Sequence, residues 1–452
     1  MATAVGVYLH VPFCTAKCHY CDFNSYAGLD RMMPSYVEAL RREIDRLPHL
    51  PPAPEPPYCR PAPPYCHPER RSVATGSLLR YGASTRGRDL SPSAQDDIET
   101  GAQDDVGKGP QDDDGRTPAD LVARTINFGG GTPSLLPPDD VRRILAAVRG
   151  RFALRDGTEV SLEANPGTVA EARLADLRAA GVNRISFGVQ SFDPTILAEL
   201  GRIHGPEEAA RARRAARAAG FESVNLDFIY GLPRQTLAVW RQTLDRALEL
   251  RPEHLSLYAL TVEPGTLFHR RAQQGLLPLP DEDLVADMYE LASEQLEAAG
   301  YEQYEISNWA LAPEHRCQHN LGYWHNLPYL GVGPGAHSWF GGRRYVDTLS
   351  PRAWVEQIGR GEPPVFGVEE IGGELELAET LMLGLRLTEG IDLAALSVRF
   401  GLDLAARFAA PIQETRELGL TELRNGRLRL TGWARLLGNE VFRRFLEAAQ
   451  AI

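Results

Sequence analysis

Short apolar runs alternate along the chain with amphipathic stretches. The runs are rich in β-branched residues and occupy positions 5–11, 125–130, 159–165, 184–190, 223–231 and 254–262. Between them, apolar residues recur three and four positions apart, which is the spacing of one helix face. Alternation of this kind predicts an α/β fold whose parallel sheet is either open or closed into a barrel.

Residues suited to chemistry follow the ends of these predicted strands. Three cysteines follow the first run, and the second ends in "GGGTPS". The next three runs end in "EANPG", Gln190 and "DFIYGLP". Because function in a parallel barrel gathers at the carboxyl ends of the strands, we expect one site at that edge.

The pattern changes from about residue 367 onward. Three helical stretches cover 374–387, 392–401 and 403–419, and a final one covers 432–450. A short hairpin precedes the last stretch, with Asn425 and Gly426 as its turn. This order resembles a winged-helix arrangement and predicts a smaller C-terminal domain over residues 367–452. Such domains bind DNA or serve as packing modules.

Residues 48–120 differ in composition from the rest of the chain. The segment is rich in proline, glycine and acidic residues and has few periodic apolar positions, which predicts a disordered insertion. It divides the expected barrel domain into residues 1–47 and 121–366. Cys59 and Cys66 lie inside it; we expect exposed thiols there, with metal binding as the alternative.

Composition narrows the classes of protein. The chain has 452 residues, of which 43% are hydrophobic, and a formal charge of -12. That charge disfavours nucleic acid as the main partner. No apolar run reaches the roughly 18 to 20 residues that cross a bilayer, and the first residues lack the features of a secretory signal. A cytoplasmic location is therefore expected.

The three cysteines after the first strand are spaced C-x3-C-x2-C, at Cys14, Cys18 and Cys21. Thiolates suit zinc, copper(I) and iron-sulfur clusters. A structural zinc normally takes four protein ligands, and no fourth ligand lies nearby in the sequence. Three thiolates on a 4Fe-4S cluster leave one iron open to the amino and carboxylate groups of S-adenosylmethionine, whose reductive cleavage gives a 5'-deoxyadenosyl radical. A buried or zinc-binding cysteine trio is the alternative.

The cysteine spacing followed by "GGGTPS" resembles the radical S-adenosylmethionine (radical SAM) superfamily. Within it, the chain is similar to the oxygen-independent coproporphyrinogen III oxidase group, through "YLHVPFC", "NFGGGTPSLL", "GVNRISFGVQSFD", "NLDFIYGLPRQT", "YEQYEISNWA" and "HNLGYW". The resemblance implies a partial, TIM-like parallel (β/α) barrel. It also implies a 4Fe-4S cluster, bound S-adenosylmethionine and a low-potential electron donor such as flavodoxin or ferredoxin.

The resemblance also places cofactor contacts on this sequence. Glycines allow close backbone approach, and the family pattern puts the methionine part of the cofactor beside Gly130, Gly131 and Thr132. Other cofactor contacts fall on Glu163, Gln190, Arg202 and Asp227, for which strand-end salt bridges are the alternative. Three further positions, which are equally suited to packing, are Tyr8, Tyr20 and Thr261.

The group has two branches, and Phe23 bears on the choice. Oxidases tend to carry a fourth cysteine at this position, whereas the haem chaperone (HemW) branch shares "CDF" and an "HNxxYW" motif, present here from His319 to Trp324. Members of that branch bind haem and pass it to recipient proteins. His319 is the predicted axial ligand, because imidazole commonly ligates haem iron, and the thiol of Cys317 is the alternative.

Three functions follow from these features. The first is a haem chaperone serving haem-receiving proteins, for example of the respiratory chain. The second is an oxidase that converts coproporphyrinogen to protoporphyrinogen, and the third is a winged-helix regulator with a redox-sensing cluster. Whether the chain is an enzyme stays open at this point, as do a homodimer and peripheral contact with a membrane.

Overall fold

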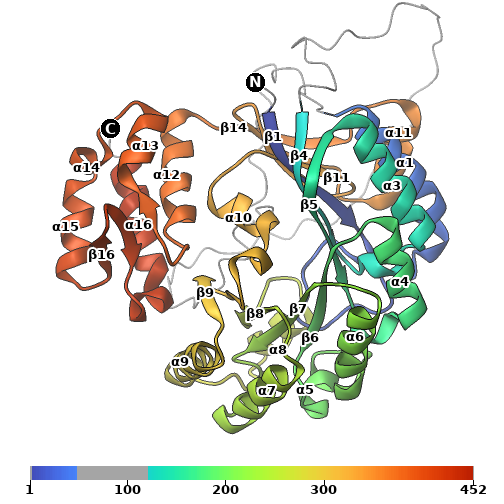
Figure 1. Cartoon of the computed structure of the whole chain (residues 1–452), viewed down its shortest axis with the longest axis horizontal. Coiled ribbons are helices and arrows are strands. Elements are labelled where there is room, and N and C mark those ends of the chain that lie inside the picture. The colour runs from blue at the N-terminus through green and yellow to red at the C-terminus, as the bar shows by residue number, and fades with distance from the viewer. Residues whose placement is uncertain (1–2, 48–120, 451–452) are drawn as a thin grey trace, which may run out of the picture.

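The computed structural model describes residues 3–47 and 121–450 (Figure 1). The expectation for the 48–120 insertion, with Cys59 and Cys66, lies outside the described residues and stays a prediction.

A single sheet of twelve strands organises most of this part of the chain. Six strands come from the predicted runs: β1 (Thr3–Val11), β4 (Leu121–Gly130), β5 (Ala153–Ala164), β6 (Arg184–Gln190), β7 (Ser223–Tyr230) and β8 (His254–Ala259). These pair in parallel in that order, and β11 (Tyr329–Val332) adds in parallel on the other side of β1. The sheet is open, which confirms a partial α/β barrel.

Antiparallel strands extend both ends of the sheet, and the sequence did not predict them. Beyond β11 lie β12 (His337–Phe340), β13 (Arg343–Asp347) and β14 (Val365–Glu370). Beyond β8 lie β10 (Asn308–Ala310) and β9 (Glu302–Glu305). A two-stranded element, β2 (Phe13–Cys14) with β3 (Tyr26–Ala27), brackets the cysteine loop.

Helices cover the outer face of the parallel strands (Figure 1). The longer ones are α1 (Met33–Asp45), α3 (Pro138–Arg151), α4 (Glu171–Ala180), α6 (Pro206–Ala218), α7 (Leu237–Leu250), α9 (Glu282–Ala298) and α11 (Pro351–Arg360). Shorter ones are α5 (Pro194–Glu199) and α8 (Leu267–Gln273). In contrast, α10 (Gln318–Trp324) lies on the inner side of the sheet, where its Asn320 lines the cavity described below (Figure 1). Turns of 3-10 helix occupy Asp30–Met32, Pro133–Leu135, Pro166–Thr168, Pro313–His315 and Trp433–Leu437.

The packing between helices and sheet explains the apolar runs. Val5, Val7, Leu9 and Val11 of β1 are fully buried, as expected for a central strand of a parallel sheet. Against this strand, α1 packs its apolar face, which includes Leu40. Burial of such side chains stabilises each by about 1.5–3 kcal/mol relative to exposure.

A second core lies in the C-terminal part. In chain order it comprises α12 (Gly373–Gly384), β15 (Ile391–Asp392), α13 (Leu393–Phe400), α14 (Leu404–Arg407), α15 (Ala409–Glu417), β16 (Thr421–Arg424), β17 (Arg427–Leu430) and α16 (Gly438–Gln450). From α12 to β17, one helix is followed by a strand, further helices and two strands, which is the order of a winged helix. Asn425 and Gly426, both with positive φ, make the predicted hairpin turn.

One predicted helix differs from the expectation, and one predicted domain limit falls within a strand. The helix predicted over 403–419 is broken at Phe408, whose ring is instead buried against Phe445. The domain limit predicted at 366/367 falls inside β14, which pairs with β13 in the main sheet. The separate C-terminal core begins with α12, and the domain limits themselves stay a prediction.

Candidate cofactor and metal site

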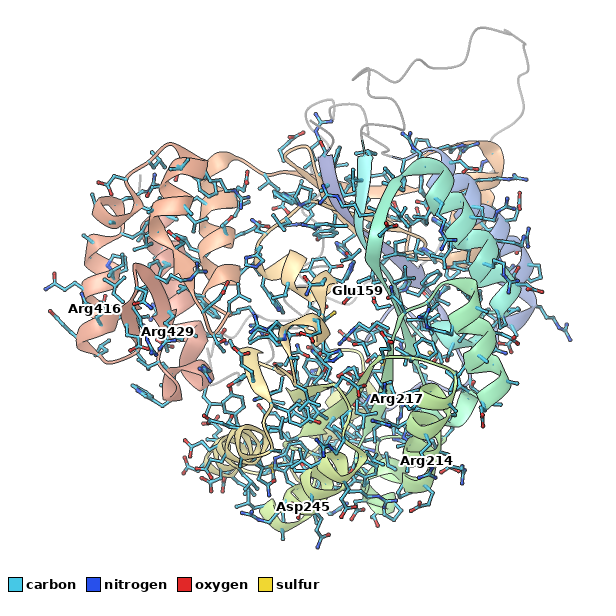
Figure 2. The ribbon with its side chains drawn as sticks, viewed as in Figure 1. Glu159, Arg214, Arg217, Asp245, Arg416 and Arg429 are labelled. Atoms are coloured by element: carbon cyan, nitrogen blue, oxygen red, sulfur yellow. The ribbon has the colours of Figure 1, made fainter. Side chains whose placement is uncertain are left out.

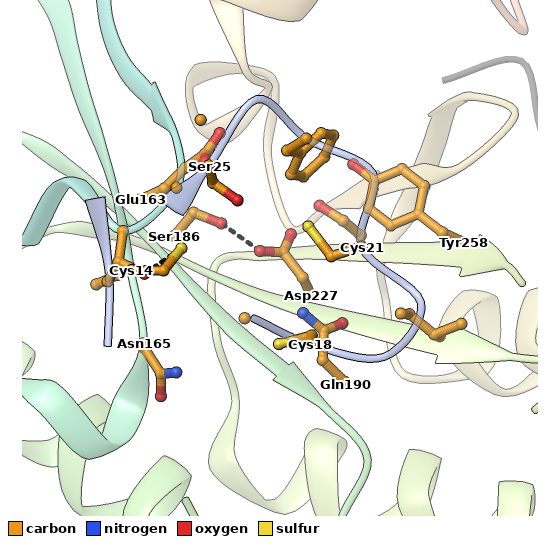
Figure 3. A pocket seen from close by; sticks show the side chains of 18 of the residues that line it. Cys14, Cys18, Cys21, Ser25, Glu163, Asn165, Ser186, Gln190, Asp227 and Tyr258 are labelled. Atoms are coloured by element: carbon orange, nitrogen blue, oxygen red, sulfur yellow. Dashed lines mark hydrogen bonds between the residues drawn. The ribbon is translucent and has the colours of Figure 1, made fainter. Parts of the chain in front are cut away.

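A cavity of about 430 Å³ opens at the carboxyl ends of the parallel strands (Figure 3). All of the predicted site residues except Tyr8 and His319 line it. From the cysteine loop come Cys14, Cys18, Tyr20 and Cys21, and from the ends of the strands and the loops after them come Gly130, Gly131, Thr132, Glu163, Gln190, Arg202, Asp227 and Thr261.

The three cysteines are partly buried and free of disulfides. Thr132 Oγ1 donates to Cys14 Sγ, and Arg202 Nη1 donates to Cys18 Sγ, each over 3.6 Å. Burial raises the pKa of Cys21 to about 11. The three thiols border one cavity (Figure 3), although among the described residues no three His, Cys, Asp or Glu side chains are close enough together to hold a single metal ion.

The cysteine loop is tied to the end of β4. Gly131 N donates to Val11 O, and Thr132 N donates to Phe13 O, each over 2.7 Å. A Cβ atom on Gly131 would lie 2.5 Å from Phe13 O, a distance that real side chains do not reach. The third glycine of "GGG" is therefore required for the turn to pass beside the cysteine loop.

The end of β6 carries a backbone conformation that is uncommon for a residue with a side chain. Gln190 has a φ of 67°, in the left-handed region. A Cβ on Gly188 would lie 2.8 Å from Gln190 Nε2. The side-chain amide of Gln190 therefore occupies space that is open only because residue 188 is glycine. Arg202 Nη2 donates to Gly188 O over 2.5 Å. This strained segment brings an amide and a guanidinium to the cavity wall.

Two partly buried carboxyl groups, Glu163 and Asp227, face the cavity. Burial, and then the charge of Asp227, raise the pKa of Glu163 to about 8. Burial also raises the pKa of Asp227, although Asp227 accepts from Ser186 Oγ (2.8 Å) and Asn225 Nδ2 (2.7 Å) (Figure 3). A cationic ligand group beside Glu163 would favour its charged form.

Sequence reasoning missed a polar network beneath these groups. Asn225 Oδ1 accepts from Ser256 Oγ over 3.1 Å and lies 2.7 Å from His254 Nδ1. On its other side, His254 Nε2 lies 2.7 Å from the Tyr304 hydroxyl. The available signal was the position of polar residues at every second place in the apolar runs of β7 and β8, on the face that turns inward.

Tyr8 lies outside the cavity lining, and its contact with a cofactor stays a prediction. Its hydroxyl lies 3.0 Å from His10 Nδ1, and His10 Nε2 lies 2.8 Å from Asn24 O in the cysteine loop. Since a carbonyl can only accept, His10 Nε2 donates there, and the Tyr8 hydroxyl donates to His10 Nδ1. Tyr8 therefore supports the loop through His10.

His319 is buried, at 3% exposure, with both ring nitrogens engaged. Nδ1 lies 2.8 Å from Thr125 Oγ1, and Nε2 lies 2.9 Å from the Tyr323 hydroxyl. Burial, with the charge of Arg124, lowers its pKa to about 3. In this conformation His319 would have to give up a hydrogen bond to ligate iron, and its role as haem ligand stays a prediction.

Cys317 and Trp324, on either side of His319, lie in different surroundings. Cys317 does line the cavity, and burial followed by the charge of Glu159 raises the pKa of its thiol to about 12. Trp324 packs beneath the Arg386 guanidinium, whose carbon lies 4.4 Å from the ring centre, in contact with α12. The motif thus braces α10 against both cores.

The donor set fits the two cofactors that the sequence predicts. Three soft thiols face one space, and Thr132 and Arg202 donate hydrogen bonds to the sulfur atoms of Cys14 and Cys18. Carboxyls, a guanidinium and glycine backbone next to them suit a ligand that carries an ammonium, a carboxylate and hydroxyl groups. S-adenosylmethionine has all three.

Many charged side chains lie on the outer helices (Figure 2). Arg214 of α6 and Asp245 of α7 are examples of this outer set (Figure 2). No helix within residues 3–47 and 121–450 is long and apolar enough to cross a membrane.

Known proteins resemble the chain over both cores. A family described as the Radical SAM superfamily matches residues 118–247, and one described as the HemN C-terminal domain matches residues 374–437. A solved structure titled coproporphyrinogen III oxidase (HemN) from Escherichia coli, a radical SAM enzyme, has a TM-score of 0.72 at 21% identity. It covers 98% of this chain and 90% of its own, which shows that the fold is shared.

Relatives of higher identity carry another name. The heme chaperone HemW of Mycobacterium tuberculosis is 35% identical over 444 residues, covering 98% of this chain and 94% of the relative. The heme chaperone HemW of Bacillus subtilis is 32% identical, with 98% and 99% covered. The chain therefore belongs to the HemW family of HemN-like radical SAM proteins.

Proposed function

We propose that this protein is a haem chaperone that holds a 4Fe-4S cluster and S-adenosylmethionine, binds haem and passes it to recipient proteins. The observation that carries the proposal is one cavity lined by three thiols and by cofactor-type polar groups, with Phe23 at its wall where oxidases tend to carry another cysteine. The names of the HemW relatives support the same function.

Cys14, Cys18 and Cys21 would hold the cluster, and Glu163, Arg202 and Asp227 would contact S-adenosylmethionine. Bound together, the two groups supply one-electron cleavage of a carbon-sulfur bond. The protein's part is to hold the loop through Lys17, whose Nζ donates to Phe23 O (2.6 Å) and Ser25 Oγ (3.0 Å). A low-potential flavodoxin or ferredoxin would supply the electron.

Haem-receiving proteins, for example of the respiratory chain, are the proposed partners. The oxidase function has less support, because the likeness to HemN at 21% identity concerns the fold. A winged-helix regulator has no specific contact in its favour.

Transfer of haem tests the proposal directly. Protein reconstituted under anaerobic conditions and loaded with one equivalent of haem should deliver it to an apo-haem protein. The control is free haem at the same concentration with a non-binding carrier of similar charge. Retention of haem, or transfer no faster than from that control, would contradict the chaperone function.

A further inference from the structure

Side chains of β1 connect two motifs that lie far apart in the sequence. The ring of Tyr8 stacks on the ring of His319 in α10, with centroids 6.4 Å apart and planes inclined by 29°. The Tyr8 hydroxyl donates to His10 Nδ1 over 3.0 Å, and His10 Nε2 donates to Asn24 O over 2.8 Å. Asn24 belongs to the cysteine loop, three residues after Cys21. Contacts therefore run without a break from α10 to the loop that carries the three thiols.

His319 is held in one orientation at the start of these contacts. Its Nδ1 lies 2.8 Å from Thr125 Oγ1 of β4, and its Nε2 lies 2.9 Å from the Tyr323 hydroxyl. A Cβ atom on Gly6 of β1 would lie 3.6 Å from His319 Cε1, so the ring also faces that strand closely. Because the ring is buried and both nitrogens are engaged, it presents a fixed surface to Tyr8.

The rings of Tyr8 and His10 also lie against the glycines at the end of β4. A Cβ atom on Gly129 would lie 2.8 Å from Tyr8 Cε2, and one on Gly130 would lie 2.6 Å from His10 Cε1. Each ring therefore occupies space that a side chain at residue 129 or 130 would need. Because Gly130 lines the cavity, the two rings position part of the cavity wall as well as the cysteine loop.

Asn24 ties the cysteine loop to a second part of the chain. Its Nδ2 donates to Pro334 O over 2.8 Å and to Leu349 O over 2.9 Å. These bonds fix where the side chain of Asn24 lies, and the hydrogen bond from His10 fixes the orientation of its backbone carbonyl. Because Cys21 is only three residues away, we expect a shift of that carbonyl to reach its thiol.

We propose that Tyr8 and His319 are positioning residues for the cysteine loop, and that they make the geometry of the cluster depend on the state of α10. Coupling of this kind passes through packed rings and hydrogen bonds. The inference rests on the proposed function, since it concerns the cluster that the loop is proposed to hold. It gives His319 a role that needs no bond to haem iron. It also implies that a ligand which breaks a hydrogen bond of His319 would change the cluster.

Two single variants and their combination test the proposal. Tyr8→Phe keeps the ring and removes the hydroxyl that donates to His10, whereas His319→Leu removes the ring on which Tyr8 stacks. Tyr289→Phe is the matched control. It removes the hydroxyl of another buried tyrosine, which donates to Ile306 O over 3.1 Å, and neither of these two residues lines the cavity.

Each variant is measured with and without the cluster. In the full-length, cluster-free protein, amide hydrogen exchange over residues 14–27 should be roughly fivefold faster in both single variants, the effect of losing one hydrogen bond. After anaerobic reconstitution, both should also show an altered electron paramagnetic resonance spectrum of the reduced cluster and faster loss of iron to a chelator. The control should match the wild type in all three measurements. The double variant should be no faster than the more affected single variant, because the two residues act in series.

Hydrogen exchange and spectra equal to those of the wild type in both single variants would overturn the proposal while leaving the cluster and the chaperone function standing. Additive changes in the double variant would show that the two residues affect the loop independently, which rejects positioning through Tyr8. If the wild type takes up no iron and sulfide, the proposed function is wrong, and hydrogen exchange alone decides this inference. Should His319→Leu not fold, Tyr323→Phe, which removes the hydroxyl beside His319 Nε2, takes its place.

Discussion

Replacing Glu43 by glutamine should reduce the pH dependence of stability between pH 5 and pH 8 by the share that Glu43 contributes. Glu43 of α1 and Asp347 of β13 are buried, at 1% and 2% exposure, and lie close enough for each to shift the pKa of the other. Glu43 Oε2 also accepts from Gly333 N over 2.9 Å. In the described part of the chain, no lysine or arginine pairs with either carboxyl. Tyr36, Tyr345 and Trp354 are their other neighbours.

The magnitude follows from the shifted pKa. Burial raises the pKa of Glu43 from 4.5 to about 7, and it raises the pKa of Asp347 as well. The folded state therefore binds a proton more tightly than the unfolded state. Stability from this group is complete below pH 4.5 and is lost as pH rises toward 7, by roughly 3 kcal/mol at about 1.4 kcal/mol per pKa unit.

Urea unfolding at a series of pH values, followed by tryptophan fluorescence, measures the effect. Between pH 5 and pH 8, Glu43→Gln should lose roughly 3 kcal/mol less stability than the wild type, because Asp347 still titrates in the variant. A matched control is Glu38→Gln on the same helix, since Glu38 is an exposed surface pair with Arg41. An unchanged slope in Glu43→Gln would refute the buried, proton-sharing pair.

Other predictions concern the cysteine loop. Replacing Cys14, Cys18 and Cys21 together by alanine should abolish the brown chromophore after anaerobic reconstitution, and undiminished iron and sulfide would refute the cluster assignment. His10→Leu should alter the electron paramagnetic resonance spectrum of the reduced cluster, whereas His10→Gln, which can still donate to Asn24 O, should restore it; equal spectra would reject the support role. Gly131→Ala should lower cluster content, because its Cβ would lie 2.5 Å from Phe13 O, while Gly150→Ala, in open space, should not; equal losses would argue against this close approach. Deleting residues 51–118 with a short linker should leave cluster content nearly unchanged, and loss of soluble protein would show that the segment is structural.

The parallel core was predictable because its strands are buried on both faces. Runs such as that of β1 are continuously apolar, and the helices between them keep a regular spacing. The antiparallel extensions were missed for the opposite reason. β9, β10 and β12 are only three or four residues long, and their pairing depends on distant neighbours, such as β8 for β10.

The site residues that belong to motifs at the ends of strands could be predicted from the sequence. Those whose contacts depend on tertiary packing could not. The cysteines and Glu163 follow apolar runs at fixed places, so they reach one cavity. His319 could not be judged in this way, because its hydrogen bonds to Thr125 and Tyr323 come from a different strand and from its own helix.

Anaerobic reconstitution followed by haem titration and a coproporphyrinogen turnover assay on the same sample tests the central claim most directly. The account predicts nearly one haem per chain, a cluster that survives haem binding, and no conversion of coproporphyrinogen. Stoichiometric formation of protoporphyrinogen, with S-adenosylmethionine consumed in step, would contradict the chaperone function and restore the oxidase.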